Sequence, residues 1–312
     1  MESRKIERSI SRFARLQRAS LVGTLGLVPM WFFGQVVRDW SWWSGLCFYI
    51  PSPVLAAVLI CWVPLHLRRR KARAAILACL AVWPLIFALF VENRLSRDRL
   101  PEVSSRLRLV HWNVGGKLDR NRAQVVLLER NADLYILSEI PDSESVEEVR
   151  QALGSEYQAQ VFGNLAAIGR GKVRADGWLI DHRRTKVQSV TWEYAGKVAN
   201  VLVVDLPSEI HIHRDPLLRE VNELVERYRP ELVVGDFNAP RRSRGLSRLP
   251  ADYRHAYDSA GTGCGYTWPV PIPVFAIDQC IYSKRIVAQN YELYSSWYSD
   301  HRVQEFDFSW LP

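Results

Sequence analysis

The sequence predicts a layered α/β domain preceded by an all-α transmembrane anchor, and three observations support this division. Three long apolar stretches follow one another within the first 91 residues. From residue 106 onward, short β-type runs alternate with helical stretches, as in a layered α/β domain. The basic excess lies at the front, because 15 Lys and Arg stand against 6 Asp and Glu in residues 1–104, leaving 26 against 27 in the rest. The net charge of +8 therefore does not by itself indicate that the C-terminal part binds nucleic acid.

The three apolar stretches occupy residues 20–37, 45–67 and 74–91, and we expect each to be a membrane helix. Each is close to the ~20 residues that cross the hydrocarbon core of a bilayer. Charged residues are confined to the gaps, which argues against the alternative of buried helices in a soluble domain. A tryptophan cluster around Trp42 stands in the first gap, where an aromatic belt at the membrane interface would lie.

Charge also predicts the orientation of the anchor. A cleavable signal peptide explains the first stretch poorly, because Arg38 and Asp39 follow it where a small-residue cleavage site would stand. The basic arm of residues 1–19 and the basic gap before residue 74 are expected to be cytoplasmic under the positive-inside rule. Three crossings would then place a linker at 92–104 and the domain at 105–312 on the extracytoplasmic, or periplasmic, side. Two crossings would leave this domain in the cytoplasm.

The predicted elements of residues 105–312 alternate in type. Long apolar runs indicate strands, and amphipathic spacing indicates helices. We expect strands at 107–114, 133–140, 198–206, 231–238 and 275–283, and helices at 122–130, 143–153 and 216–228. Cys264 and Cys280 lack the spacing of a zinc site, and a disulfide between them stays an open alternative.

Polar side chains stand at the ends of several very apolar strands. Asn113, Glu139, Asp236 and Asn238 occupy such positions, where unpaired carboxylates are costly. Strand ends that converge on one rim would gather these side chains into an acidic, amide-rich pocket suited to a hard cation. Each residue alone has a plainer explanation as a turn or strand-end residue. Their occurrence together, each after an apolar strand, favours a site.

These residues resemble the successive motifs of the endonuclease/exonuclease/phosphatase (DNase I-like) superfamily, which includes abasic-site endonucleases, DNase I, sphingomyelinases and inositol polyphosphate 5-phosphatases. The motifs are WNV at 112–114, SEI at 138–140, GDFN at 235–238, GYTWP at 265–269, ID at 277–278 and SDH at 299–301. The chain looks like a membrane-anchored, bacterial-type member, and the resemblance covers about residues 105–312. It implies a four-layered α/β sandwich of two packed mixed β-sheets, with the active site at one rim.

The resemblance also implies roles for individual residues. Glu139 would be the principal ligand of Mg²⁺ or Mn²⁺, assisted by Asn113 and Asp300. Asp236 and Asn238 would position and deprotonate the attacking water and hold the phosphoryl oxygens. Oxygen ligands of this kind are those that Mg²⁺ prefers.

A histidine and its partner complete the implied site. His301 would contact the scissile phosphate, and Asp278 would orient its ring and favour the imidazolium. Many relatives carry a further histidine in the strand before GDFN, where this sequence has Asp205 in VVDLPS. A carboxylate cannot donate a hydrogen bond to phosphate unless it is protonated. His211 or His213 could replace the missing donor, or both could be exposed loop residues.

The implied function is that of a metal-dependent hydrolase that cleaves a phosphodiester or phosphomonoester by in-line attack of water. The substrate class stays open between nucleic acid and a phospholipid head group. Arg241 and Arg242, directly after GDFN, could contact either or lie in a solvated loop. The bilayer is the other expected partner, and no protein partner is indicated. The alternative is a membrane-tethered binding or scaffold protein that retains the fold without catalysis, which only Asp205 favours. Gly115 and Gly116 stand where some nucleases carry another acid, which favours one metal ion.

Overall fold

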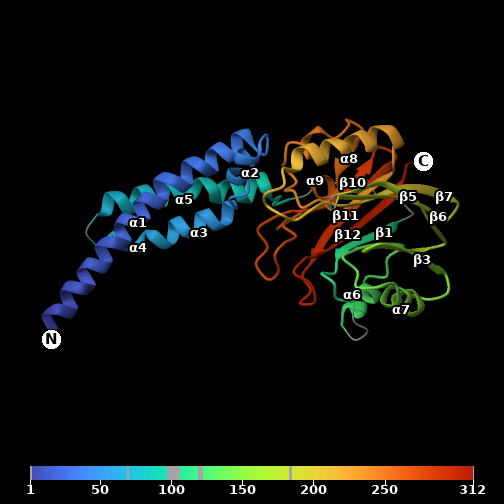
Figure 1. Cartoon of the computed structure of the whole chain (residues 1–312), viewed down its shortest axis with the longest axis horizontal. Helices are drawn as coiled ribbons and strands as arrows, with labels where there is room; N and C mark the ends of the chain where they lie inside the picture. The colour runs from blue at the N-terminus through green and yellow to red at the C-terminus, as the bar shows by residue number, and fades with distance from the viewer. Residues whose placement is uncertain (1, 69, 97–105, 119–121, 183–184, 312) are drawn as a thin grey trace. The chain divides into compact units, whose positions relative to one another are not determined.

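The chain divides into two compact units, residues 1–92 and 93–312, and each is described by itself (Figure 1). The computed structural model describes residues 2–68, 70–96, 106–118, 122–182 and 185–311, with side chains from residue 12 onward. Most of the predicted linker at 92–104, and the side chains at the start of the predicted basic arm, lie outside the described part.

The first unit is helical. Two of its helices have candidate spans, Arg12–Val37 and Lys71–Glu92, that are long and apolar enough to cross a membrane. The helices are α1 (Glu2–Val37), α2 (Trp42–Phe48), α3 (Ser52–Trp62), α4 (Pro64–Leu67) and α5 (Lys71–Phe87), which a π-helical turn (Ala88–Glu92) extends.

The second predicted membrane helix, over 45–67, differs from the expectation of one continuous element. α2 and the helical segment that starts at Ser52 meet at an angle of 58°. Pro51 stands at the break in an extended conformation and precedes α3. Proline cannot donate the backbone hydrogen bond that would continue the preceding helix. Within the described residues, two helices are therefore long and apolar enough to span a membrane, or three if the bent pair counts as one span.

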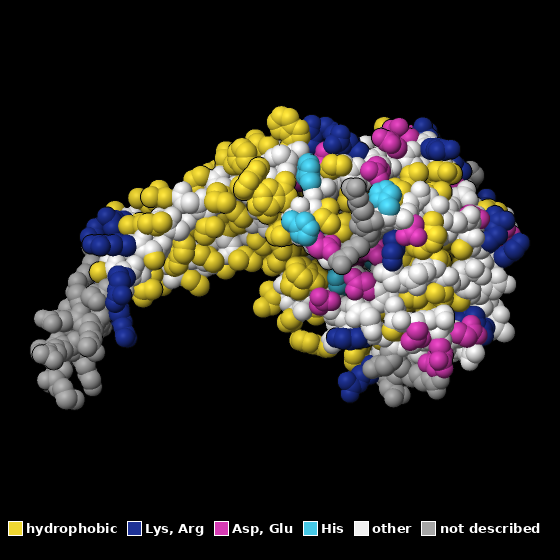
Figure 2. All heavy atoms as spheres, viewed as in Figure 1, with side chains coloured by type: hydrophobic (Ala, Val, Ile, Leu, Met, Phe, Trp, Pro, Cys, Tyr) yellow, Lys and Arg dark blue, Asp and Glu magenta, His cyan; other side chains and the backbone are white. Residues whose placement is uncertain are grey.

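Many large apolar side chains of the first unit point outward. Phe32, Trp83 and Phe90 are 63%, 69% and 65% exposed, whereas Leu59 and Leu77 pack inside. Figure 2 shows hydrophobic side chains covering the visible face of the helices. A water-soluble bundle would bury such surface. Outward apolar side chains are the distribution expected of helices that face lipid.

The second unit contains two six-stranded mixed sheets. The first has the order β11 (Ile286–Tyr294), β12 (Val303–Trp310), β1 (Leu107–Asn113), β2 (Leu134–Ser138), β4 (Leu165–Arg170) and β3 (Tyr157–Phe162). The second has the order β5 (Lys172–His182), β6 (Thr185–Tyr194), β7 (Lys197–Asp205), β8 (Leu232–Asp236), β10 (Asp278–Ser283) and β9 (Tyr253–His255). Within the sheets β1 pairs with β2, and β7 with β8, in parallel, and the other pairs are antiparallel.

Helices cover the outer faces of both sheets. α6 (Ala123–Arg130) and α7 (Ser143–Leu153) share a core with β1 and β2, and α8 (Arg214–Tyr228) shares one with β7 and β8. In Figure 1, α8 lies above the strands and α6 and α7 lie below them. Short helices η2 (Leu246–Arg248) and α9 (Ala256–Ala260) complete the unit. The predicted four-layered sandwich with two packed mixed sheets is confirmed.

Residue parity along the strands decides which side chains meet between the sheets. On β2, Leu134 and Ile136 enter the core between the sheets, while Tyr135 and Leu137 pack under the helices. Successive side chains of a strand point to opposite faces, so every second residue faces the other sheet. Asn113 on β1 has the same parity as Leu109, which lies in the core between the sheets. Its side chain therefore points toward the second sheet.

Candidate active site

Strands of both sheets bring polar residues to one rim of the sandwich. The parallel strands β1 and β2 end there, as do β7 and β8, because each pair runs in the same direction. β10 is antiparallel to β8 and begins at this rim with Asp278 opposite Asp236. β12 is antiparallel to β1, so the segment before it, which contains His301, also lies there. The topology thus gathers residues from six strands at one edge.

Asn113 connects the two sheets at this rim. Its Nδ2 donates to Glu139 Oε1 and to Asp236 Oδ2, both at 3.0 Å. Gly115 N donates to Asn113 Oδ1 (3.0 Å), which sets the orientation of the amide. Glu139, directly after β2, is exposed and Asp236 on β8 is buried. One amide therefore holds an accessible and a buried carboxylate close together.

The GDFN segment owes its shape to Gly235. A Cβ at this position would lie 1.9 Å from the carbonyl oxygen of Val204, so only glycine allows β7 and β8 to approach here. Asp236 Oδ1 accepts from Asn238 N (2.9 Å). Asn238 adopts a left-handed conformation with φ of 46°, and its Nδ2 donates to Leu206 O (2.8 Å). The carboxylate of Asp236 is thus held at a fixed position at the rim.

Asp278 and His301 form a buried pair. His301 Nδ1 lies 2.9 Å from Asp278 Oδ2, and His301 Nε2 lies 3.9 Å from Asp236 Oδ2. The backbone at His301 is fixed by a hydrogen bond from its N–H to Ser299 Oγ (3.0 Å). Ser299 Oγ in turn donates to Asn113 O (2.7 Å), which joins this segment to the end of β1.

The charges of this pair stabilise each other. Burial alone would lower the pKa of His301, but the charge and hydrogen bond of Asp278, aided by Asp236 and Asp300, raise it to about 10. Burial alone would raise the pKa of Asp278, but the charge and hydrogen bond of His301 outweigh burial and lower it. At neutral pH the ring is therefore an imidazolium whose Nε2 faces Asp236.

Asp300 lies at the exposed edge of the site. Its Oδ2 accepts a hydrogen bond from Trp268 Nε1 (2.8 Å). Its Oδ1 lies 3.6 Å from the position of a Cβ on Gly115, the residue whose N–H binds Asn113. The same turn also bonds to the backbone of Glu139, because Gly116 N donates to Glu139 O (2.8 Å). The turn after β1 therefore lies next to two residues, Asp300 and Glu139, that have exposed carboxylates.

The donor set fits a hard divalent cation. Glu139, Asp300, Asp236 and the amide of Asn113 offer oxygen atoms, as Mg²⁺ and Mn²⁺ prefer. Burial raises the pKa of Asp236 well above its usual value, the charge of Asp278 adds to this, and the charge of His301 opposes it. A bound cation would further stabilise the ionised carboxylate.

Another set of possible ligands is Asp236, Asp278 and His301, whose ligand atoms lie within 4.8 Å of one another. An imidazolium has a proton on both nitrogens and cannot bind a metal ion. The pKa of His301 is raised to about 10 by its acidic neighbours, so these three residues also form an ion-pair cluster. A cation on the side of this cluster toward Glu139 stays a prediction.

The fold of the second unit is shared with known proteins, although the sequence is not. No protein-family profile matches the sequence, and no curated protein matches it significantly. Solved structures do match. A humanized D. rerio TDP2 has a TM-score of 0.52 at 19% identity, over 66% of this chain and 100% of that chain. An endonuclease/exonuclease/phosphatase family protein from Bacteroides thetaiotaomicron has a TM-score of 0.52 at 14% identity, over 67% and 99%. The second unit has the endonuclease/exonuclease/phosphatase fold.

Asp205, His211 and His213, the residues considered above as possible substrate contacts, differ in their surroundings. Asp205 ends β7 directly opposite Asp236 and is 9% exposed, and burial raises its pKa to about 6. His211 is exposed in the turn before α8, and His213 precedes the first residue of that helix. The described hydrogen bonds do not connect either histidine to Asp236.

The arginines after GDFN are also more structural than the sequence suggested. Arg241 is 9% exposed, pairs with Asp258 (2.9 Å) and lies over the ring of Tyr257 at 4.1 Å. Arg242 is half-buried. The structure therefore gives Arg241 a packing role, and a substrate contact by either arginine stays a prediction.

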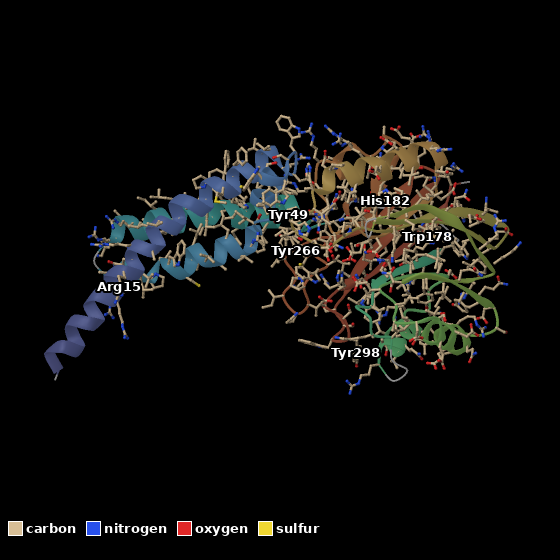
Figure 3. All side chains as sticks on the ribbon, in the orientation of Figure 1. Arg15, Tyr49, Trp178, His182, Tyr266 and Tyr298 are labelled. Atoms are coloured by element: carbon tan, nitrogen blue, oxygen red, sulfur yellow. The ribbon has the colours of Figure 1, made fainter. Side chains whose placement is uncertain are left out.

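A groove of about 460 Å³ adjoins the site of the endonuclease/exonuclease/phosphatase fold. Gly116, which bonds to Glu139 O, is part of its lining. Lys117 and Arg122 supply cations, and Trp297, which is 81% exposed, and Tyr298 supply aromatic rings; Figure 3 shows Tyr298 beside α6. Sequence reasoning missed this groove, because its residues come from loops and helix starts that are far apart in the sequence.

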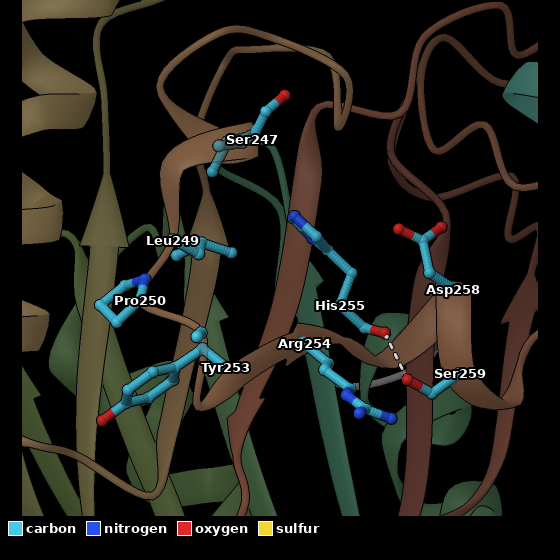
Figure 4. A pocket seen from close by; sticks show the side chains of 10 residues that line it. Ser247, Leu249, Pro250, Tyr253, Arg254, His255, Asp258 and Ser259 are labelled. Atoms are coloured by element: carbon cyan, nitrogen blue, oxygen red, sulfur yellow. Dashed lines mark hydrogen bonds between the residues drawn. The ribbon is translucent and has the colours of Figure 1, made fainter.

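A second hollow, of about 550 Å³, has a different chemical character (Figure 4). Its lining includes Tyr253, Arg254, His255 and Asp258. Asp258 pairs with Arg241, and burial lowers the pKa of His255 to about 4, so this ring is neutral near pH 7. The acid cluster at the rim is therefore the stronger candidate for an active site.

Proposed function

We propose that this chain is a membrane-anchored, divalent-metal-dependent phosphoesterase that hydrolyses a phosphate ester by in-line attack of water. The observation that supports this most directly is the amide of Asn113, which binds Glu139 and Asp236 beside the Asp278–His301 pair. One cluster thus offers a carboxylate for a metal ion, a carboxylate for a proton and a cation for the phosphate. The likeness to solved structures of this fold agrees with the proposal.

Each group has a separate task in the proposed reaction. Bound Mg²⁺ or Mn²⁺, held by Glu139 with Asp300 and Asn113, would neutralise phosphate oxygens and make a bound water more acidic. Asp236 accepts the proton of the attacking water, and its buried position makes its carboxylate a stronger base. His301 donates from Nε2 to an oxygen on which negative charge builds up.

The direct test is hydrolysis by the full-length chain in detergent micelles. The substrates are a generic phosphodiester, a single-stranded oligonucleotide, supercoiled plasmid and a phospholipid panel, each with Mg²⁺, Mn²⁺ or EDTA. We expect metal-dependent cleavage that EDTA abolishes. If no substrate is cleaved and calorimetry detects no metal binding, the tethered binding or scaffold protein becomes the better explanation.

Glu139→Gln should weaken metal binding because it removes the accessible carboxylate charge and keeps the side-chain shape. We expect the Mn²⁺ dissociation constant to rise about 10- to 100-fold, with part of the activity restored at high metal concentration. Titration calorimetry with Mn²⁺ measures this change. Glu144→Gln, an exposed residue in the first turn of α7, is the matched control. Unchanged Mn²⁺ affinity in Glu139→Gln would remove this residue from the metal site.

Within the proposed function, we favour single-stranded nucleic acid over a phospholipid as substrate. The groove beside Glu139 has Lys117 and Arg122 for phosphates and an exposed ring at Trp297 for stacking. Cations along a groove together with aromatic platforms are how single strands are bound without sequence preference. One of the similar structures is a D. rerio TDP2 complexed with a single-strand DNA product.

Trp297→Ala tests this substrate class. Stacking of one base contributes ~1–3 kcal/mol, so the KM for a single-stranded oligonucleotide should rise about tenfold, with little change for a small phosphodiester. Ile272→Ala, which removes another highly exposed apolar side chain outside the groove, should change neither. If both variants instead lose vesicle binding or phospholipid hydrolysis, the phospholipid alternative takes precedence.

For the anchor, we propose three crossings, with a cytoplasmic N-terminus and an extracytoplasmic second unit. The basic residues near the N-terminus and between the second and third apolar stretches support this orientation. If the bent α2–α3 pair does not cross, the second unit is cytoplasmic. Fusions of alkaline phosphatase or a fluorescent protein to the C-terminus distinguish the two arrangements. The alkaline phosphatase fusion is active only if the second unit lies outside the cytoplasm.

A further inference from the structure

Four charged residues form one row across neighbouring strands of the second sheet. Asp278 pairs with Asp236, Asp236 with Asp205, and Asp205 with Lys186. Residues directly opposite on neighbouring strands point to the same face, and the strands lie ~4.8 Å apart. The core between the sheets holds residues of the same parity on the same strands, namely Val190, Val203, Val234 and Cys280. Lys186 is therefore a cation that faces the other sheet at the catalytic rim.

Hydrogen bonds hold Lys186 in this position. Its Nζ donates to Asn164 Oδ1 (2.5 Å), and Asn164 Nδ2 donates to Asp205 Oδ2 (3.1 Å). Asn164 lies in the turn between β3 and β4, and its carbonyl accepts from Ile140 N (3.0 Å). Ile140 directly follows Glu139. The hydrogen bonds that connect Lys186, Asn164 and Asp205 are thus attached to the segment that carries Glu139, the main predicted metal ligand.

Electrostatics also connect this chain with the active site. Burial raises the pKa of Asp205, and the charge of Glu139 adds to the shift, while Asn164 and Lys186 oppose it. Asp205 also contributes to the raised pKa of Asp236. Asp205 therefore lies within the electric field of the catalytic carboxylates, and Lys186 is the cation attached to it.

A glycine stands beside the ammonium group. A Cβ on Gly163, whose φ is 61°, would be in van der Waals contact with Lys186 Nζ (3.8 Å) and with the ring of Trp178 (3.5 Å), so no side chain of this turn residue covers the ammonium. Figure 3 shows Trp178 on the same sheet, near His182 of the same strand. An ammonium has three donor hydrogens, and one of those on Lys186 is directed at Asn164.

We propose that Lys186, positioned by Asn164 and Asp205, binds a non-bridging oxygen of the substrate's phosphate and replaces the donor that Asp205 cannot supply. The inference rests on the proposed function and names a substrate-binding residue of the same site. In this inference Asp205 has a structural task. It accepts a hydrogen bond from Asn164, which in turn holds Lys186 in place. An aspartate at position 205, where many members of the resembled superfamily carry a histidine, is then compatible with catalysis.

The experiment measures kinetics of the full-length chain in micelles with a generic phosphodiester. Lys186→Met should lower kcat/KM about 10- to 100-fold, the range of a hydrogen bond to a charged group, with Mn²⁺ affinity unchanged. Lys186→Arg, which keeps the charge, should recover most of the loss. The KM of Lys186→Met should also rise less steeply with NaCl than that of wild type, because a charge contact to substrate is screened by salt.

The control is Lys172→Met, which removes an exposed lysine on β5 that lies 3.8 Å from Glu193. Wild-type kinetics in Lys186→Met, or an equal loss in Lys172→Met, would overturn the inference. If the melting curve of Lys186→Met is altered, Lys186→Gln replaces it under the same criteria. Absence of hydrolysis by wild type would refute the proposed function itself, whereas an active wild type matched by Lys186→Met refutes only the role of Lys186.

Discussion

Asp236→Asn should lower kcat about 10³-fold and leave the fold intact. Asp236 is 1% exposed, and its carboxylate accepts from Asn238 N and Asn113 Nδ2 at the point where the sheets meet. An amide cannot accept the proton of the attacking water, and general-base catalysis contributes about 10²–10⁴-fold. The measurement is kcat for a generic phosphodiester at saturating metal concentration, with circular dichroism to verify folding.

Stability should change much less than activity in this variant. Burial and the charge of Asp278 raise the pKa of Asp236, which means that the folded state disfavours the ionised carboxylate. Removing that charge should offset the loss of one of the two hydrogen bonds that the carboxylate accepts, so the melting temperature should stay nearly unchanged. Asp258→Asn, at an exposed carboxylate paired with Arg241, is the matched control and should keep full activity. Near-normal kcat in Asp236→Asn would assign the proton transfer to another residue.

Asp278→Asn should have the second largest effect, and that effect should depend on pH. In wild type the pKa of His301 is raised to about 10, so the ring stays protonated through neutral pH. Without the charge and hydrogen bond of Asp278, burial is opposed only by Asp236 and Asp300, so the pKa of His301 should fall well below its wild-type value. A ring with the ordinary pKa of about 6.5 is about 3% protonated at pH 8, so kcat/KM at that pH should fall by up to ~30-fold.

The pH profile distinguishes this role from general damage to the site. The alkaline limb of kcat/KM should lie near pH 10 in wild type and at a clearly lower pH in Asp278→Asn, because activity needs the protonated ring. The double variant Asp278→Asn/His301→Ala should be no less active than His301→Ala alone, since the two residues act as one unit. A pH profile in Asp278→Asn parallel to that of wild type would show that the ionisation of His301 does not limit the reaction.

The sequence predicted well those strands and helices whose apolar pattern is visible within a single segment. The apolar runs at β1, β2 and β8 end within two residues of the predicted bounds, and the helix predicted at 143–153 is α7. In each case a run of buried residues or an amphipathic stripe was visible within one segment. Such patterns need no knowledge of distant partners.

The strands from β3 to β6 and the two C-terminal strands β11 and β12 were missed for physical reasons. β5 is largely exposed or half-buried and carries many polar residues, so it lacks an apolar run. β12 is almost entirely buried although it contains Glu305 and Asp307, because Arg108 of β1 pairs with both of them. Charge pairing between segments about two hundred residues apart cannot be inferred from either segment alone.

The contrast between patterns within one segment and contacts between distant segments also explains which site residues were predicted and which were missed. Asn113, Glu139 and Asp236 were visible because each stands at the end of an apolar strand, and the topology brings them together. Lys186 and Asn164 belong to the region of missed strands, and the groove residues such as Trp297 stand in loops. Their proximity depends on strand order across the sheets, which no local pattern encodes.

The bond network of Asn113 has a consequence for how such a protein can change over time. Glu139 and Asp236 belong to different sheets, so the thickness of the core between the sheets determines the distance between the proposed metal ligand and the proposed base. Interiors are densely packed and transmit changes in volume, so variation in that core would alter the reaction itself. Side chains that line the groove without bonding to either residue, such as those of Lys117 and Trp297, are less constrained. Under the proposed function, new substrates can therefore be acquired through these side chains while the chemistry is inherited with the core.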